Sequence, residues 1–316
     1  MPEVQAPPDA PGQAAFARGG VIVIDKPAGP TSHDVVAAVR RHCGGAKVGH
    51  TGTLDPFATG VLPLVVGRAT RLARFLGGSD KEYVTRIRLG VATDTHDITG
   101  HVVSQAPEAE ALAAAGGAAA LLPAFLGRGL QSPPAYSAKL SDGVRAYEQA
   151  RRGRAVDLAP AEVTVFEIDM LEMEGPSVTV RLVTSAGFYV RAFARDIGER
   201  LGVGASLDAL RRTRSGAFRL SEAVTLDAIQ EPGLREHLIP IDALLPDCPA
   251  AVLTPEGVER IAHGRDIGPG HLRGTPEGAA GAPQHSAIRL LGPDGGLLAL
   301  AELASGGVLH PAVVLM

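Results

Sequence analysis

The feature that most constrains the fold is an alternating pattern between residues 81 and 89. Uncharged side chains occupy every second position, at Tyr83, Thr85, Ile87 and Leu89. Charged side chains lie between them, at Glu82, Arg86 and Arg88. Successive side chains of a strand point to opposite faces, so this segment is predicted to be a strand with one buried and one exposed face.

Further strands and helices follow from shorter patterns. Runs rich in β-branched residues predict strands at residues 20–25, 61–66, 162–168 and 177–183. Thr31 and Asp34 form a capping-box-like pair at the start of a predicted helix, and a second helix is predicted from Val190 to a C-terminal Gly202. A third is expected at residues 108–120. Because the strands are scattered without regular βαβ repeats, the pattern indicates an α+β fold with a mixed, mainly antiparallel sheet.

The chain is expected to hold more than one domain. Its 316 residues are too many for one small module. Residues 1–17 are rich in Pro, Ala and Gly and are predicted to be a flexible leader. Residues 18–248 would form the main domain. In residues 249–316, short strand-like runs alternate with Gly/Pro turns, which predicts a small β module.

The charge distribution leaves the partner open at this stage. A net charge of −4 argues against a nucleic-acid partner if it is taken alone. However, arginines gather in three clusters, at Arg68, Arg71 and Arg74, at Arg151, Arg152 and Arg154, and at Arg211, Arg212, Arg214 and Arg219. Arginine binds phosphate in a bidentate way, but a solvated surface or a GC-rich genome would explain the clusters equally well.

Other classes of protein find little support. The two cysteines, Cys43 and Cys248, lie far apart without metal-ligand spacing, so we expect neither a disulfide nor a metal site. No apolar run reaches the roughly 18 residues that cross a bilayer, and the first residues lack the pattern of a signal peptide. A soluble, cytoplasmic protein is therefore expected.

The segment Gly49-His-Thr-Gly-Thr-Leu-Asp-Pro-Phe-Ala-Thr-Gly60 is the most distinctive loop. Its glycines permit unusual backbone angles and close approach of a ligand, and Pro56 fixes the chain just after Asp55. The loop is neither a Walker loop nor a dinucleotide fingerprint. Local chemistry leaves two interpretations: a carboxylate displayed to a substrate, or an aspartate that stabilises a turn.

A family resemblance favours the first interpretation. The loop resembles the catalytic motif of TruB-type pseudouridine synthases, Gly-His-x-Gly-x-Leu-Asp-Pro-x-Ala-x-Gly. Other segments resemble motifs of the same family in the same order, over about residues 20 to 220: Asp25-Lys26-Pro27, Lys81-x-Tyr83, Thr93-Asp94-Thr95-x-Asp97, Gln131-x-Pro-Pro134 and Gly187-x-Tyr189-x-Arg191.

The resemblance implies a reaction and roles for its residues. The family isomerises uridine to pseudouridine, here at position 55 in the T-loop of tRNA, after flipping the base out of the stack. Asp55 would be the nucleophile, attacking either ribose C1' or uracil C6. Arg191 would pair with it, and Tyr83 would stack on the uracil and serve proton transfer at C5. The reaction needs no cofactor and no metal.

The resemblance also implies substrate contacts and domains. Tyr189 would be a second pocket tyrosine, and His50 would fill the space that the flipped base leaves. Further substrate-binding residues are expected at Lys26, Pro27, Asp94, Arg151, Arg152, Arg211 and Arg212. Residues 18–248 would be the catalytic domain, with a thumb-like segment at about 131–154 that meets RNA. Residues 249–316 would be a barrel-like PUA-type RNA-binding domain.

The expected partner is the T-arm stem-loop of tRNA, bound by a monomer without a guide RNA or an obligatory protein partner. One alternative is a guide-RNA-dependent synthase of the box H/ACA type, which shares the catalytic motif. Another is a noncatalytic tRNA-binding or tRNA-folding protein on the same fold. The thumb-like segment and the lack of a long basic tail favour the stand-alone enzyme, and intact Asp55, Tyr83 and Arg191 favour catalysis.

Overall fold

The computed structural model describes residues 16, 18–137, 139–141, 144–146, 149, 152, 158–229, 233–274, 287–304 and 307–316. Most of the predicted leader lies outside these residues, as does most of the thumb-like segment beyond Ser137. Phe16, within the predicted leader, is only 4% exposed and packs in the main core. Phe16 therefore belongs to the folded domain, because its aromatic ring is buried there.

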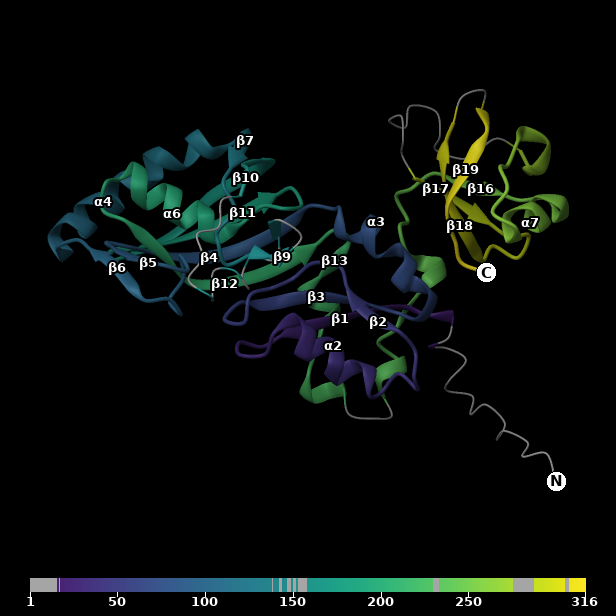
Figure 1. Ribbon diagram of the computed structural model, residues 1–316, viewed down its shortest axis with the longest axis horizontal. Helices are drawn as coiled ribbons and strands as arrows, with labels where there is room; N and C mark the ends of the chain where they lie inside the picture. Colours follow the sequence, from purple (N-terminus) through teal and green to yellow (C-terminus); the bar gives the residue numbers. More distant parts are fainter. Residues whose placement is uncertain are drawn as a thin grey trace.

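One large sheet forms the centre of the main domain (Figure 1). Its strands follow the order β14–β1–β3–β12–β4–β11–β10–β7. They are β1 Gly20–Lys26, β3 Thr59–Val66, β4 Lys81–Leu89, β7 Gly127–Gln131, β10 Ala161–Glu174, β11 Ser177–Thr184, β12 Ala205–Ser215 and β14 Val224–Thr225. Three short strands pair alongside: β2 Val48–His50 with β3, β13 Phe218–Arg219 with β12, and β15 Ile239–Pro240 with β1.

The sheet is mixed and mainly antiparallel, as predicted. Parallel pairing occurs between β1 and β14 and between β3 and β12, and the other pairs of the described sheet are antiparallel. Strand β4 has the predicted alternation, with Tyr83, Thr85 and Ile87 buried between more exposed neighbours. Lys81 also lies on the buried face and is 5% exposed.

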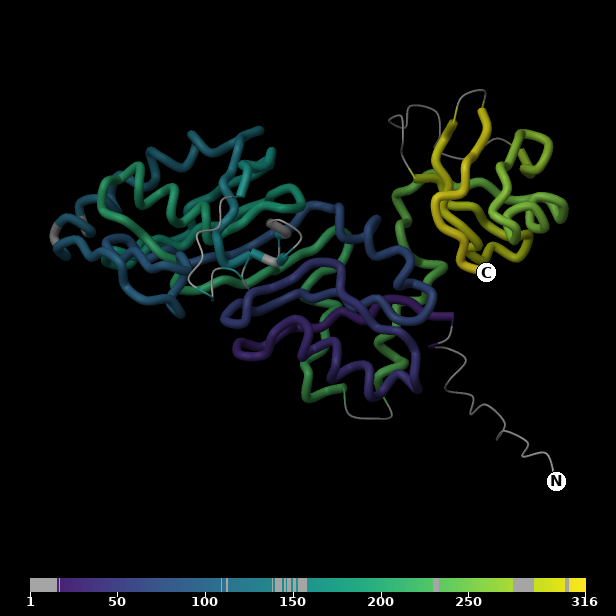
Figure 2. Tube along the Cα trace, viewed as in Figure 1, coloured from purple at the N-terminus to yellow at the C-terminus, as the bar shows by residue number. Residues whose placement is uncertain are grey.

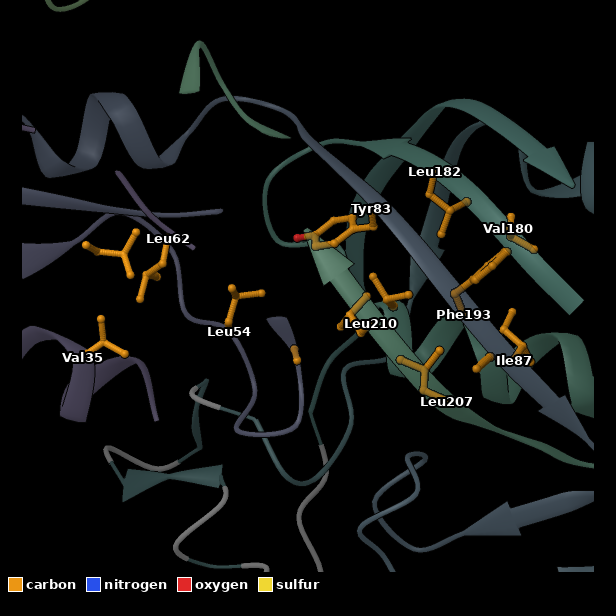
Figure 3. Packing of buried hydrophobic residues seen from close by; sticks show 14 of the residues in the cluster. Val35, Leu54, Leu62, Tyr83, Ile87, Val180, Leu182, Phe193, Leu207 and Leu210 are labelled. Atoms are coloured by element: carbon orange, nitrogen blue, oxygen red, sulfur yellow. The ribbon is translucent and has the colours of Figure 1, made fainter. Parts of the chain in front are cut away.

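Three helices pack against the sheet: α2 Ser32–Arg40, α4 Glu108–Leu121 and α6 Val190–Arg200. Their apolar side chains join those of β1, β3, β4 and β11 in one core cluster, part of which is drawn in Figure 3. The predicted capping box at Thr31 is present, and Gly202 follows α6 with a φ of 76°. No helix in the described part of the chain is long and apolar enough to cross a membrane.

The C-terminal residues form a second, smaller body beside the main domain (Figure 2), and its Leu297, Leu300 and Leu315 share a core cluster with residues of β1 and β3. It has a four-stranded sheet in the order β16–β17–β18–β19 and one helix. These elements are β16 Ala250–Val252, α7 Pro255–Ala262, β17 Ala287–Leu291, β18 Leu297–Leu303 and β19 Leu309–Val314. A core cluster of its own supports the predicted β module. Its closure into a PUA-like barrel and its boundary at residue 249 stay predictions.

The first arginine cluster connects these two bodies. It lies on the short helices η1 Gly67–Leu72 and α3 Ala73–Gly77. Arg68, Arg71 and Arg74 donate hydrogen bonds to the carbonyls of Leu315, Val314 and Ala312 at 3.0, 2.7 and 3.4 Å. These guanidinium groups contact the end of β19, so the cluster has a structural role in addition to its charge.

The remaining elements are short. They comprise the hairpin of β5 Val91–Thr93 and β6 Val102–Gln105, the pair β8 Leu140–Ser141 and β9 Val144–Arg145, and the 3₁₀ turns at Leu122–Phe125, Leu220–Glu222, Asp227–Ile229, Gly233–Arg235, Ile241–Ala243 and Pro269–His271.

Candidate active site

The loop that carries Asp55 is fixed from both sides. It joins β2 to β3 over residues 51–58. Before Asp55, the Leu54 N–H donates to Ser32 Oγ at 2.8 Å and Ser32 Oγ donates to the Leu54 carbonyl at 3.0 Å. After it, the Gly29 N–H donates to the Pro56 carbonyl at 2.8 Å. These contacts hold the backbone on either side of the carboxylate.

Lys26 lies beneath the same loop and has no exposed surface. Its ammonium group donates to the carbonyls of Pro27, Pro56 and Ala58 at 2.8, 3.0 and 2.7 Å. Burial lowers the pKa of Lys26 from 10.5 to about 8, although the charge of Asp55 opposes this. All three ammonium hydrogens are used within the protein, so Lys26 supports the loop and does not reach a substrate directly.

Asp55 and Arg191 meet at the start of α6. Arg191 Nε donates to Asp55 Oδ2 at 2.9 Å and Nη2 donates to Oδ1 at 3.0 Å. The Asp55 side chain is 31% exposed, whereas that of Arg191 is 6% exposed. The carboxylate is therefore held by a buried partner and still faces solvent, as a nucleophile must.

Arg191 is itself fixed by groups that sequence reasoning did not assign. Its Nη1 donates to the Thr95 carbonyl at 2.9 Å and its Nη2 donates to the Tyr136 carbonyl at 2.7 Å. Asp97 Oδ2 lies 3.7 Å from Arg191 Nε, and the Asp97 side chain is 5% exposed. Thr95 and Asp97 belong to the motif Thr93-Asp94-Thr95-x-Asp97, and Tyr136 follows the motif that ends at Pro134, so their positions were visible in the sequence but their roles were not.

Two tyrosines face the charge of Asp55. Burial raises the pKa of Tyr83 and of Tyr189, and Asp55 adds a smaller effect in the same direction. Tyr83 is 7% exposed, and Figure 3 shows its hydroxyl on the side of the ring that faces Leu54. Gln131 holds Tyr189 by bonding to both its backbone N–H and its carbonyl, at 2.8 and 3.1 Å.

The other predicted contact residues are distributed around the loop. His50 is half-buried at the start of the loop, and its Nδ1 accepts from the Gly52 N–H at 3.3 Å. Pro27 is exposed beside Lys26. Asp94 lies in the β5–β6 hairpin, where its carboxylate accepts from the His101 N–H at 2.8 Å, and its substrate contact stays a prediction. Asp97, three residues later, is the acidic group of this motif that lies near Arg191.

The predicted arginine contacts separate into different environments. Arg212 is only 1% exposed, so a phosphate could not reach it without a change in the fold. This burial does not fit the predicted substrate contact of Arg212, because its side chain lies on the buried face of β12, whereas Arg211 and Thr213 on the other face are partly exposed. Arg211 is 39% exposed and pairs with Asp25 at 2.8 Å. Arg152 is exposed, and Arg151 lies outside the described residues.

The described side chains thus place one held carboxylate, one buried arginine and two tyrosines in a single site. Within the same part of the chain, no group of three or more His, Cys, Asp or Glu side chains could hold a metal ion. A carboxylate that is fixed and partly exposed can form and release a covalent bond to carbon, and tyrosines can stack on a base and exchange protons.

Comparison with known proteins assigns the family. Residues 40–190 match the model of the TruB family pseudouridylate synthase N-terminal domain, and residues 191–246 match the tRNA pseudouridylate synthase B C-terminal domain. This chain belongs to the TruB family. Asp55, Tyr83 and Tyr189 lie in the first matched range, and Arg191 lies in the second. The TruB family ranges end just before β16.

Similar proteins extend the TruB match over nearly the whole chain. A tRNA pseudouridine synthase B of Solibacter usitatus is 42% identical over 300 residues, covering 94% of this chain and 99% of that protein. One from Mycobacterium sp. strain KMS is 43% identical over 277 residues, covering 86% and 92%. The crystal structure of an archaeal box H/ACA sRNP Nop10–Cbf5 complex contains a chain of 27% identity and TM-score 0.70, covering 100% and 92%.

Proposed function

We propose that this protein isomerises uridine to pseudouridine in tRNA, at position 55 of the T-loop, with Asp55 as the nucleophile. The bidentate contact between Arg191 and Asp55 carries this proposal, because it holds a partly exposed carboxylate in one orientation beside two tyrosines. The high coverage of relatives named tRNA pseudouridine synthase B supports the same substrate class.

The residues suggest a sequence of steps. The target base leaves the RNA stack and enters the site, where a tyrosine ring gives it a stacking surface. Asp55 attacks C1' or C6, the N1–C1' bond breaks, and C5 then bonds to C1'. Tyr83 accepts the C5 proton, the electron pair of the C5–H bond restores the C5=C6 double bond, and N1 gains a proton from solvent. No electron is gained or lost overall.

The substrate would be a folded T-arm stem-loop, bound by a monomer without a guide RNA. A guide-dependent activity is the second candidate, because a chain in a box H/ACA complex shares the fold at a TM-score of 0.70. The higher identity of the tRNA pseudouridine synthase B relatives, 42% against 27% for the box H/ACA chain, favours the stand-alone enzyme.

The decisive experiment uses the purified full chain and an unmodified T-arm stem-loop, with pseudouridine as the measured product. Wild type should convert the target uridine without any added RNA or protein. Asp55→Asn keeps the shape of the side chain and should abolish turnover. Activity that appears only after a guide RNA is added would replace the stand-alone proposal, and full turnover by Asp55→Asn would remove the proposed nucleophile.

A salt titration tests the RNA contacts. If exposed arginines such as Arg152 meet phosphates, the affinity for the stem-loop should fall steeply as the salt concentration rises, because bound phosphates release counterions. An affinity that does not depend on salt would mean that the exposed arginines form a solvated face.

A further inference from the structure

Arg212 is the largest side chain that the main core encloses completely. It lies on β12, between β3, which follows the loop that carries Asp55, and β4, which carries Tyr83. On one side it pairs with Gly60 of β3, at the end of the catalytic loop, and on the other with Tyr83 of β4. Because directly opposed residues of neighbouring strands have adjacent side chains, Arg212 and Tyr83 form a cross-strand pair.

The guanidinium group of Arg212 has no acidic partner among the described residues. It donates through Nε to the Val61 carbonyl at 2.7 Å and through Nη2 to the Gly52 carbonyl at 3.1 Å. Every ion pair in the described part of the chain uses other residues. Burying a charge without a counter-charge costs free energy, so we expect the buried guanidinium group of Arg212 to have a function.

Tyr83 is a polar side chain that interacts favourably with Arg212. The two are joined by a side-chain hydrogen bond. A guanidinium group can only donate hydrogen bonds, so the Tyr83 oxygen must be the acceptor. The Tyr83 hydroxyl hydrogen then remains free to point into the site. Burial raises the pKa of Tyr83, and Arg212 opposes that effect.

We propose that Arg212 is a positioning residue for Tyr83, whose phenol oxygen it fixes and whose phenolate form it stabilises during proton exchange at uracil C5. The proposal rests on the proposed function. In the step concerned, the Tyr83 phenol first gives its proton to solvent, and the resulting phenolate takes the C5 proton and becomes a phenol again, while the C5–H electron pair forms the C5=C6 bond. The electrons displaced to N1 are neutralised by a proton from solvent.

Arg212 also bonds to the Gly52 carbonyl in the loop that carries Asp55. Its action on Tyr83 must therefore be distinguished from simple support of that loop. A residue that only holds the loop would affect every step that involves Asp55. A residue that acts through Tyr83 affects only the step that removes the C5 proton. Substrates that differ at C5 therefore distinguish the two roles.

The experiment measures single-turnover rates on three T-arm stem-loops. Their target nucleotide is uridine, uridine with deuterium at C5, or 5-fluorouridine, which has no C5 proton to lose. For Arg212→Gln we expect about a 10²-fold slower reaction of the uridine RNA, the scale of lost acid–base catalysis. The ratio of the hydrogen to the deuterium rate should rise above that of wild type. Cleavage of the N1–C1' bond in the 5-fluorouridine RNA should keep its wild-type rate.

Two further variants complete the design. Arg212→Lys keeps a cation inside the sheet and so protects the fold if Arg212→Gln does not fold. Its ammonium group lacks the planar fork, and it should show a smaller loss, again confined to the substrates with a C5–H bond. Arg86 is a half-buried arginine on the same strand as Tyr83, paired with Glu174 and Asp208, and Arg86→Gln should leave all three rates unchanged.

The possible results separate the two proposals. Equal slowing of the uridine and 5-fluorouridine RNAs, with an unchanged isotope ratio, would overturn the role of Arg212 and leave the enzyme assignment intact. A wild-type protein that converts none of the RNAs would instead overturn the proposed function. In the supporting case, adding Arg212→Gln to Tyr83→Phe should cause no further slowing, because both act on one step.

Discussion

Arg191 holds both oxygens of Asp55 at once, with Nε 2.9 Å from Oδ2 and Nη2 3.0 Å from Oδ1. Such a two-point contact fixes the plane of the carboxylate as well as its position. The chain brings the two residues together over 136 positions, from the loop before β3 to the first turn of α6. Arg191 also donates to the carbonyls of Thr95 and Tyr136, so the arginine cannot rotate away without losing several contacts.

Replacing Arg191 by lysine should therefore reduce catalysis much more than binding. A lysine keeps the charge but offers a single ammonium group, so Asp55 would lose its fixed direction. We expect the single-turnover rate to fall by about 10²-fold, the effect of misplacing a reacting group by about 1 Å. The affinity for the T-arm stem-loop, measured by filter binding, should change little.

Arg195→Lys is the matched control for this substitution. Arg195 lies one turn later on α6 and pairs with Asp196 at 2.6 Å. Its substitution should leave the rate near that of wild type. A similar loss in both variants would mean that α6 as a whole, and not the contact with Asp55, determines the rate.

Lys26 should make stability depend on pH in a defined direction. Burial lowers its pKa from 10.5 in the unfolded chain to about 8 in the folded protein. Between these values the unfolded chain binds more protons, so the contribution of Lys26 to the free energy of unfolding becomes more favourable as pH rises through that window. Below a pH of about 8 the full cost of burying the charge is present.

Urea unfolding over this pH range tests the prediction. The free energy of unfolding of wild type, relative to Lys26→Met, should increase from a pH of about 8 to 10.5. Lys47→Met provides the control, since Lys47 is exposed on the surface. A wild-type advantage over Lys26→Met that stays constant or shrinks with pH would show that Lys26 is not a buried cation.

Much of the fold could be predicted because its signals are local. The alternation in β4 and the capping pair Thr31 and Asp34 each depend on residues within one element, so tertiary contacts did not have to be known. Asp55 needed more than local chemistry, because an aspartate before a proline is equally suited to a turn. The order of the motifs, and not the loop alone, identified it.

What could not be predicted depends on contacts between distant strands. Arg212 stands in a run of arginines that resembles a phosphate-binding surface, and its burial follows only from the position of β12 between β3 and β4. The partnership of Asp97 with Arg191 likewise joins the end of a hairpin to the start of a helix. No sequence periodicity encodes either contact.

Gly60 should tolerate no side chain. Its φ is 101°, and an added Cβ would lie 2.2 Å from the carbonyl oxygen of Arg212. Gly60→Ala must therefore strain the backbone and also push β3 away from β12. Gly29→Ala measures the cost of the backbone strain without a steric clash, because Gly29 has a φ of 108° and open space where its Cβ would lie.

The two glycine variants would be compared by thermal unfolding and by their single-turnover rates. Gly29→Ala should lose roughly 1–3 kcal/mol of stability, the usual cost of a strained backbone. Gly60→Ala should lose clearly more and should also slow the reaction, since Arg212 and the loop move with β3. Equal losses in the two variants would mean that the contact with Arg212 is readily relaxed.

The arginines of η1 and α3 should hold the C-terminal sheet in place. Arg68 and Arg71 bond to the carbonyls of Leu315 and Val314, and each such bond contributes about 1 kcal/mol. The double variant Arg68→Met/Arg71→Met should therefore open the end of β19 more often, and its amide hydrogens should exchange with deuterium roughly 30-fold faster. Arg40→Met, at the exposed end of α2, should leave that exchange unchanged. If exchange in β19 is as slow in the double variant as in wild type, the apolar contacts of the C-terminal sheet are sufficient to hold it, and the arginines contribute only charge.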